Sequence, residues 1–258
     1  MTFKVFYKLV KFILFLVSYF VSSILILIAS GFSMNKARIK LTRNISRHSK
    51  LGLWLLGIKI KEVTSLGEYN GNYLIVCNHL SYLDILIIAS RFPTCFVTSI
   101  EMKNTPLLGQ MCSLGGCLFV ERRSKLGLSN EIKNLTQALR DKMNVTVFPE
   151  ATSTNGQELF QFKRPLFQAA VDANKKVLPL CLNYRKANGE KITVGNRDLL
   201  FWYGDMTFFP HFIEFLKLDD IEVELNELPL IEVSNQTKED LALKSYEAVK
   251  NEFIPIRV

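Results

Sequence analysis

A run of 21 residues without a charge, from Phe12 to Phe32, constrains the fold of this chain most strongly. A helix over this run would be about 30 Å long, which matches the hydrocarbon thickness of a bilayer. A secretory signal peptide is the competing interpretation, because Lys4, Lys8 and Lys11 precede the run. The run is longer than a typical signal core, and no clean A-x-A-like cleavage site follows it. We therefore expect residues 1–61 to form a basic membrane anchor, either a transmembrane helix or a re-entrant helical hairpin.

The positive charge of the chain lies in this same segment. Residues 1–61 carry eleven Lys or Arg and no acid, whereas the other residues carry the remaining 21 of the 32 bases against 24 acids. This distribution excludes a globally basic nucleic-acid binder and favours contact with a membrane surface. Because bases flank the apolar run on both sides, we expect both of its ends to lie on the cytoplasmic face of the membrane, as on a bacterial inner membrane. The second apolar stretch, Leu51–Ile60, is too short to cross and is expected to form an interfacial helix anchored by Trp54.

From about residue 73 onward, short apolar runs alternate with helical periodicity, so we expect one α/β domain over residues 62–258. The apolar runs predict strands at 73–77, 95–99, 117–121, 145–148, 177–183 and 221–225, with a short strand near 191–194. Helical periodicity predicts helices at 83–90, 107–114, 128–139, 166–173 and 241–253. Near-continuous apolar strands separated by helices predict a mostly parallel sheet covered by helices on both faces.

Cysteine usage gives little support to metal chemistry. The chain has five cysteines, an odd number without a C-x-x-C pair, which is typical of free thiols in a reducing compartment. Cys112 and Cys117 could serve as metal ligands, but no histidine lies near them in the sequence. We therefore expect no metal site.

Polar side chains follow three of the predicted strands at their carboxyl ends. Residues 78–84 follow the first strand, residues 121–123 follow the third, and residues 149–153 follow the fourth. In an open α/β sheet, ligands bind beyond the carboxyl ends of the strands. The sequence therefore predicts that these three clusters converge at one edge of the sheet.

The first cluster contains His79 and Asp84, which suit general-base chemistry. Asp84 would lie in the first turn of a helix, where its carboxylate can accept a hydrogen bond from one imidazole nitrogen and leave the other as a base. No G-x-S-x-G motif supplies a serine nucleophile. A His–Asp pair without a protein nucleophile suits direct activation of a substrate hydroxyl. The competing interpretation is that His79 caps the helix or contacts a loop carbonyl.

The other clusters offer groups for an anionic substrate. Arg122 and Arg123 could hold a phosphate or carboxylate through two hydrogen bonds, or form a surface charge pair. Glu150 could position a substrate or an arginine, whereas Thr152 could cap a helix. Lys163 precedes the helix expected near Pro165, where it could bind an anion together with backbone N–H groups.

The two remaining histidines are not expected to take part in chemistry. We expect His48, in the basic run, to face lipid headgroups and His211 to pack against its aromatic neighbours.

Together these residues resemble the glycerolipid acyltransferase family, typified by 1-acylglycerol-3-phosphate acyltransferases. The matching blocks lie between about residues 70 and 185 in the expected order: Asn78, His79 and Asp84 in N-H-x-x-x-x-D, Gly116, Phe119 and Arg122 in G-x-x-F-x-x-R, Phe148-Pro149-Glu150-Ala151-Thr152 in F-P-E-G-T, and Pro179 in an apolar block. The resemblance implies an O-acyltransferase in which His79, oriented by Asp84, acts as general base on a lysolipid hydroxyl. That hydroxyl attacks an acyl thioester of CoA or acyl carrier protein, and no metal or other cofactor takes part.

The resemblance also implies which residues bind substrate and which acceptor they bind. Residues in the matching blocks, together with Lys163, are the expected substrate-binding set: Asn78, Gly116, Phe119, Arg122, Glu150, Thr152, Lys163 and Pro179. The first acceptor to expect is 1-acylglycerol-3-phosphate, giving phosphatidic acid. Three departures from the family pattern, Glu121, Ala151 and Pro165, make another lysolipid, such as a lyso-phospholipid or lyso-ornithine lipid, a competitor. A non-catalytic lipid-binding module is a further alternative.

Among the departures, Ala151 carries a backbone expectation. It replaces the usual glycine of F-P-E-G-T and puts a Cβ where that block favours a positive φ.

Overall fold

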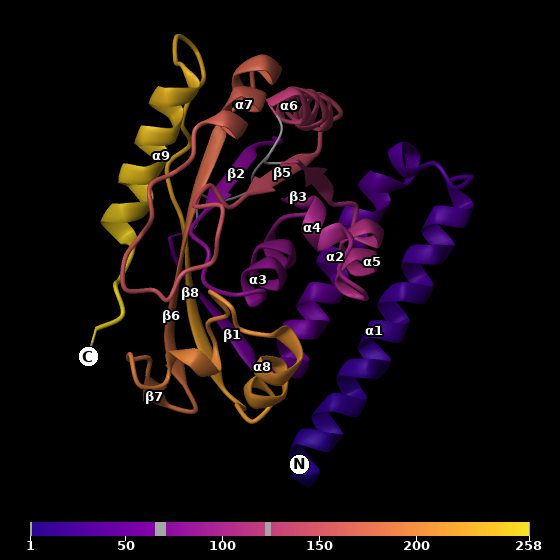
Figure 1. Cartoon of the computed structure of the whole chain (residues 1–258), viewed down its shortest axis with the longest axis vertical. Helices are drawn as coiled ribbons and strands as arrows, with labels where there is room; N and C mark the ends of the chain where they lie inside the picture. Colours follow the sequence, from indigo (N-terminus) through magenta and orange to yellow (C-terminus); the bar gives the residue numbers. More distant parts are fainter. Residues whose placement is uncertain (1, 65–70, 122–124, 258) are drawn as a thin grey trace.

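The N-terminus of the chain forms a pair of long helices. The computed structural model describes residues 2–64, 71–121 and 125–257. Helices α1 (Phe3–Ala29) and α2 (Met34–Leu56) run antiparallel along one side of the molecule (Figure 1). α1 begins well before the uncharged run, because the Thr2 hydroxyl accepts the N–H of Val5 and caps the helix. Among the described residues, α1 is the one helix long and apolar enough to cross a membrane.

The segment after α2 differs from the expectation, and the interfacial helix predicted at Leu51–Ile60 is wrong. Leu51–Leu56 completes α2, Gly57 ends it in the left-handed conformation with φ of 72°, and strand β1 (Ile58–Thr64) follows. The alternation of isoleucine and lysine that begins at Ile58 is typical of a strand. The expected boundary between residues 61 and 62 falls within β1, so the division into an anchor of 1–61 and a domain of 62–258 stays a prediction.

The rest of the chain is built on the expected mixed sheet. The strand order is β1-β8-β6-β2-β5-β3-β4, and the short β7 pairs with β6. Pairing is parallel except where β6 meets β7 and β8. The remaining strands are β2 (Leu74–Cys77), β3 (Thr94–Ser99), β4 (Leu118–Val120), β5 (Asn144–Val147), β6 (Val177–Ala187), β7 (Glu190–Lys191) and β8 (Ile221–Glu227). All six longer predicted strands are confirmed. Short apolar runs rich in β-branched residues form strands that are buried on both faces of a sheet.

Helices cover both faces of the sheet, which confirms the predicted fold class. α6 (Lys125–Arg140), α7 (Gln168–Ala173) and α9 (Lys238–Glu252) lie on one side. On the other side lie α2 and α3 (Leu83–Arg91), with α1 outside α2 (Figure 1). Three further helices complete the described part of the fold: α4 (Ile100–Lys103), α5 (Leu108–Leu114) and α8 (Phe208–Phe215). Single 3₁₀ turns, η1 and η2, occupy Pro165–Phe167 and Arg197–Leu199.

Polar side chains line the interface between α1 and α2. The amide of Asn44 donates to the hydroxyls of Ser22 and Ser23 at 2.9 and 3.0 Å. The His48 ring lies between the helices, with Nε2 3.3 Å from the Ser18 hydroxyl. The expectation that His48 faces lipid headgroups is therefore wrong.

α1 also contacts the domain along much of its length. Lys8 forms an ion pair with Asp219 at 2.8 Å, before β8. Phe12 packs against Phe212 of α8 with ring centroids 4.6 Å apart. Further along, the Tyr19 hydroxyl donates to the carbonyl of Met111 in α5 at 2.8 Å. The opposite side of α1 leaves its large apolar side chains exposed: Phe6, Val10, Ile13, Leu14, Val17, Val21, Ile24, Leu25 and Ile28.

Candidate active site

The loop between β2 and α3 brings the two predicted catalytic side chains together. His79 Nδ1 lies 2.8 Å from Asp84 Oδ2, and Asp84 is fully buried in the first turn of α3. The same oxygen accepts the N–H groups of Leu80 and Ser81 at 2.7 and 2.9 Å. Because the ionised carboxylate can only accept, the imidazole proton lies on Nδ1 and leaves the lone pair on Nε2. The expected His79–Asp84 contact is present, and its catalytic role stays a prediction.

Hydrogen bonds to the backbone of two other segments, at Thr154 and at 200–202, hold this loop in place. The His79 carbonyl accepts the N–H of Thr154 at 2.9 Å, and the Leu80 carbonyl accepts the N–H of Trp202 at 3.0 Å. The Ser81 hydroxyl donates to the carbonyl of Leu200 at 2.7 Å. The position of the imidazole is thus set by residues distant in the sequence.

Glu150 lies beside the dyad and contacts backbone. Its Oε1 accepts the N–H of His79 and its Oε2 accepts the N–H of Phe160, both at 2.8 Å. Burial raises the pKa of Glu150 to about 7, against the opposing effect of these two donors. These contacts suit a residue that positions the His79 loop. Its predicted contact with substrate stays a prediction.

Two aromatic side chains at the dyad were missed in the sequence. The Phe148 ring stacks on the His79 imidazole, with centroids 3.9 Å apart and planes 13° from parallel. The Tyr184 hydroxyl, from β6, donates to Asp84 Oδ1 at 2.7 Å. Phe148 belongs to the F-P-E-A-T block, which could have suggested a role, whereas no local signal marks Tyr184.

The structure confirms the backbone expectation for Ala151. This residue has φ of 62°, and its N–H closes a turn onto the carbonyl of Phe148 at 3.0 Å. A Cβ in the left-handed region costs roughly 1–2 kcal/mol. The turn is the one that brings Glu150 under His79.

Asn78 and Pro179 belong to the frame of the sheet. The buried amide of Asn78 donates to the carbonyl of Leu182 at 2.9 Å and accepts its N–H at 2.8 Å. This continues the pairing of β2 with β6 beyond the end of β2. Pro179 lies within β6, opposite Val76 of β2. Their predicted contacts with substrate stay predictions.

Gly116 lies just before β4, against α2, and Phe119 lies within β4. Gly116 has φ of 80°, and a Cβ there would lie 3.2 Å from Cγ of Arg38 in α2. The ring of Phe119 lies beneath the ammonium of Lys103, 5.4 Å from the ring centroid. Backbone conformation and the close approach of α2 therefore both favour glycine at position 116.

The remaining predicted binding residues lie on the surface or outside the described ranges. Thr152 is exposed, and its hydroxyl donates to the carbonyl of Ser153 at 3.3 Å. Lys163 is also exposed, and its N–H donates to the carbonyl of Pro149 at 2.9 Å. Arg122 lies outside the described residues. The substrate-binding roles of these three residues stay predictions.

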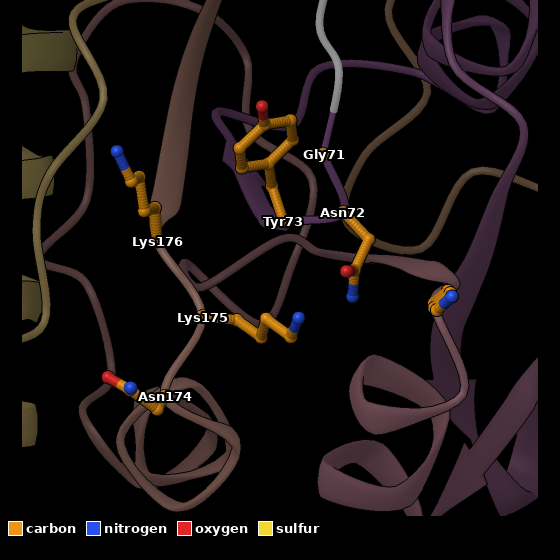
Figure 2. A pocket seen from close by; sticks show the side chains of 7 residues that line it. Gly71, Asn72, Tyr73, Asn174, Lys175 and Lys176 are labelled. Atoms are coloured by element: carbon orange, nitrogen blue, oxygen red, sulfur yellow. The ribbon is translucent and has the colours of Figure 1, made fainter.

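A cavity of about 740 Å³ lies at the amino ends of the strands, opposite the end where the dyad lies (Figure 2). It is lined by residues that precede β2, β5 and β6, including Lys142, Lys175 and Lys176. Because the dyad follows the carboxyl end of β2, this cavity is separate from the candidate active site. The described residues contain no cluster of three or more His, Cys, Asp or Glu able to hold a metal ion. The five cysteines are free thiols, as expected.

The chain is similar to lipid acyltransferases. It is 33% identical over 159 residues to a 1-acyl-sn-glycerol-3-phosphate acyltransferase of Neisseria meningitidis, a match that covers 62% of this chain and 60% of that protein. It is 29% identical over 196 residues to a lyso-ornithine lipid O-acyltransferase of Rhizobium meliloti, covering 73% of this chain and 67% of that protein. The chain thus spans about half to two thirds of the length of the curated relatives it matches.

A solved structure has the same fold. The crystal structure of the 1-acyl-sn-glycerophosphate acyltransferase PlsC of Thermotoga maritima aligns with a TM-score of 0.62 over 95% of this chain and 96% of that chain. The two sequences are 19% identical, so this likeness is evidence of fold alone. The model of the Acyltransferase family matches residues 57–183, which contain β1, the dyad and Glu150. By that match this chain contains an Acyltransferase-family domain over residues 57–183.

Proposed function

We propose that this protein transfers a fatty acyl group from a thioester to the hydroxyl of a lysolipid, with 1-acylglycerol-3-phosphate as the first candidate acceptor. The observation that carries the proposal is the contact between His79 Nδ1 and the buried carboxylate of Asp84. A carboxylate at Nδ1 keeps the imidazole in the tautomer whose Nε2 can accept a proton. Among the described residues, Nε2 of His79 has no hydrogen-bond partner, which leaves it available to a substrate.

The reaction needs one proton transfer in each direction. Nε2 of His79 takes the proton of the acceptor hydroxyl as its oxygen attacks the thioester carbonyl carbon. The carbon–sulfur bond then breaks, and the imidazolium returns the proton to the leaving thiolate. Asp84 stabilises the imidazolium between the two steps. The donor is an acyl-CoA or an acyl carrier protein, and the mechanism uses no metal or redox group.

Relatives support two acceptor classes. The Neisseria meningitidis relative is named for 1-acyl-sn-glycerol-3-phosphate, and the Rhizobium meliloti relative for lyso-ornithine lipid. In the first case Arg122 would bind the phosphate; in the second the acceptor has no phosphate. Lyso-ornithine lipid is therefore the second candidate acceptor.

A panel of acceptors tests the proposal. Purified protein is given one labelled acyl-CoA or acyl carrier protein and either 1-acylglycerol-3-phosphate, a lyso-phospholipid or lyso-ornithine lipid, and acylated product is measured. We expect one acceptor to be acylated faster than the others. With that acceptor, His79→Ala should lower the turnover of the enzyme by at least about 10³-fold. The control is His48→Gln, which removes an imidazole between α1 and α2 and should leave turnover largely intact. Transfer by His79→Ala at the wild-type rate would remove the imidazole from the mechanism. No transfer to any acceptor would favour a lipid-binding module.

We also propose that α1 and α2 lie in the plane of the membrane surface on the cytoplasmic face. Two features support an in-plane arrangement over a true span. The first is that α1 is bound to the domain from Lys8 to Tyr19, so a perpendicular α1 would carry Asp219 into the bilayer at high cost. The second is that α2 exposes a stripe of bases at helical spacing, followed by an exposed Trp54: Lys36, Lys40, Arg43, Arg47 and Lys50.

Protease protection distinguishes the two arrangements. The experiment places one tag before Thr2 and another in the turn at Gly31. Inverted membrane vesicles, whose cytoplasmic face is outward, are then treated with protease. Cleavage of both tags is expected for an in-plane α1. Protection of one tag would mean that α1 spans the bilayer.

A further inference from the structure

Asp84 is held at both carboxylate oxygens, and the two oxygens have different partners. Oδ2 accepts from His79 and from the N–H groups of Leu80 and Ser81. Among the described residues, Oδ1 receives one hydrogen bond, from the Tyr184 hydroxyl at 2.7 Å. Tyr184 is 2% exposed, so this contact is shielded from water.

The length and register of β6 place Tyr184 under the dyad. β2 ends at Cys77, opposite Leu180, while β6 continues to Ala187. The Asn78 amide fixes the register by pairing with Leu182. Two residues further along, Tyr184 lies beneath the start of α3. Its ring packs edge-on against Phe201, with centroids 5.4 Å apart.

The geometry points to Tyr184 as a positioning residue for the His79–Asp84 pair, an inference that rests on the proposed acyl transfer. Its hydroxyl holds Oδ1 so that Oδ2 faces His79 Nδ1. It does not touch the imidazole and takes no part in proton transfer. Its effect on the reaction passes through the carboxylate.

Two consequences follow for the reaction. Without the phenol hydrogen bond, the carboxylate can rotate about its Cβ–Cγ bond, and His79 loses its fixed orientation. In addition, a carboxylate that no longer donates charge density to a phenol attracts the imidazolium more strongly. The first effect lowers the rate of the chemical step, and the second displaces the pH dependence of that rate.

Tyr184→Phe keeps the ring and removes the hydroxyl. We expect kcat to fall by about tenfold to 100-fold, as for loss of a hydrogen bond to a charged group, with KM changed less than about twofold. The acid limb of the kcat profile should move to higher pH. In the Asp84→Asn background the same change should cost no further activity, because Tyr184 acts through Asp84. A further loss there would overturn the inference.

Tyr82→Phe is the matched control. Tyr82 is partly buried and lies two residues before Asp84; its hydroxyl lies 3.0 Å from His211 Nδ1 and does not contact Asp84. We expect a comparable loss of thermal stability and an unchanged acid limb. Equal effects of the two variants on the acid limb would mean that Tyr184 has a structural role only.

A second variant covers the case in which Tyr184→Phe does not fold. 3-Fluorotyrosine introduced at position 184 keeps the hydroxyl and makes it a stronger donor. The acid limb should then move to lower pH, opposite to the shift for phenylalanine. An unmoved limb would overturn the positioning role. Absence of activity in the wild-type protein would instead contradict the proposed acyl transfer.

Discussion

The Glu150 carboxylate accepts the backbone N–H of His79 at 2.8 Å, and so binds the residue that supplies the imidazole through its main chain. The other oxygen accepts the N–H of Phe160, which belongs to the segment that follows the same turn. Glu150 thus joins the loop after β2 to the loop after β5. Its acidity is therefore linked to the stability of the site.

Glu150→Gln should change how stability depends on pH. Burial raises the pKa of Glu150 in the folded state to about 7, above its ordinary value of 4.5. Its protonation therefore stabilises the fold fully below pH 4.5, and this contribution is lost as pH rises through about 7. We expect the free energy of unfolding of the wild-type protein to fall, relative to the variant, by on the order of 2 kcal/mol between pH 5.5 and 8. Urea unfolding at both pH values checks this, and parallel pH profiles would contradict it.

Ala151→Gly should stabilise the protein. Glycine removes the Cβ strain at φ of 62° but adds conformational freedom to the unfolded chain. We expect a net gain of about 0.5–1 kcal/mol in the free energy of unfolding. The control is Ala248→Gly within α9, where the same change should cost about 1 kcal/mol. A loss of stability in both variants would show that the turn does not strain Ala151.

Gly116→Ala should weaken the contact between β4 and α2. The added Cβ would be strained at φ of 80° and would lie 3.2 Å from Arg38 Cγ. Gly189→Ala is the matched control, because Gly189 has φ of 83° and nothing within 4 Å of the added Cβ. Each variant should lose about 1 kcal/mol from backbone strain, and Gly116→Ala should lose more. Thermal or urea unfolding measures both losses. Equal losses of unfolding free energy in the two variants would mean that α2 moves to accommodate the added Cβ at no cost.

Neutralising the basic stripe of α2 should weaken binding to anionic membranes. The triple variant Lys40→Gln, Arg43→Gln and Arg47→Gln should lose about 3 kcal/mol, or roughly 100-fold, at low salt. Flotation with vesicles that contain phosphatidylglycerol measures the loss, and vesicles of phosphatidylcholine alone should show little change. The matched control removes three lysines from α9, on the far side of the molecule: Lys238, Lys244 and Lys250 (Figure 1). Equal losses in the two triple variants would mean that α2 does not face the lipid.

The elements that were wrong or missed have local causes. β1 was missed because the apolar end of α2 runs without a break in composition into Ile58, and Gly57 separates them by conformation alone. α8 was missed because its eight residues, Phe208–Phe215, contain a proline and give too short a periodic pattern. The strands flanking the dyad were predicted because each is a buried apolar run bounded by turns.

The sequence by itself determined six of the strands and the pairing of His79 with Asp84, because each of these depends on residues within one short segment. The alternation of these strands with helices along the chain then indicated the fold class. Five positions separate the two side chains, and a turn into a helix brings them together locally. Only the tertiary structure decided what surrounds them. Glu150 lies 71 positions from His79, and Tyr184 lies 100 positions from Asp84. Their contacts depend on which strands pair and in what register, and pairing between distant segments leaves no pattern in either segment alone.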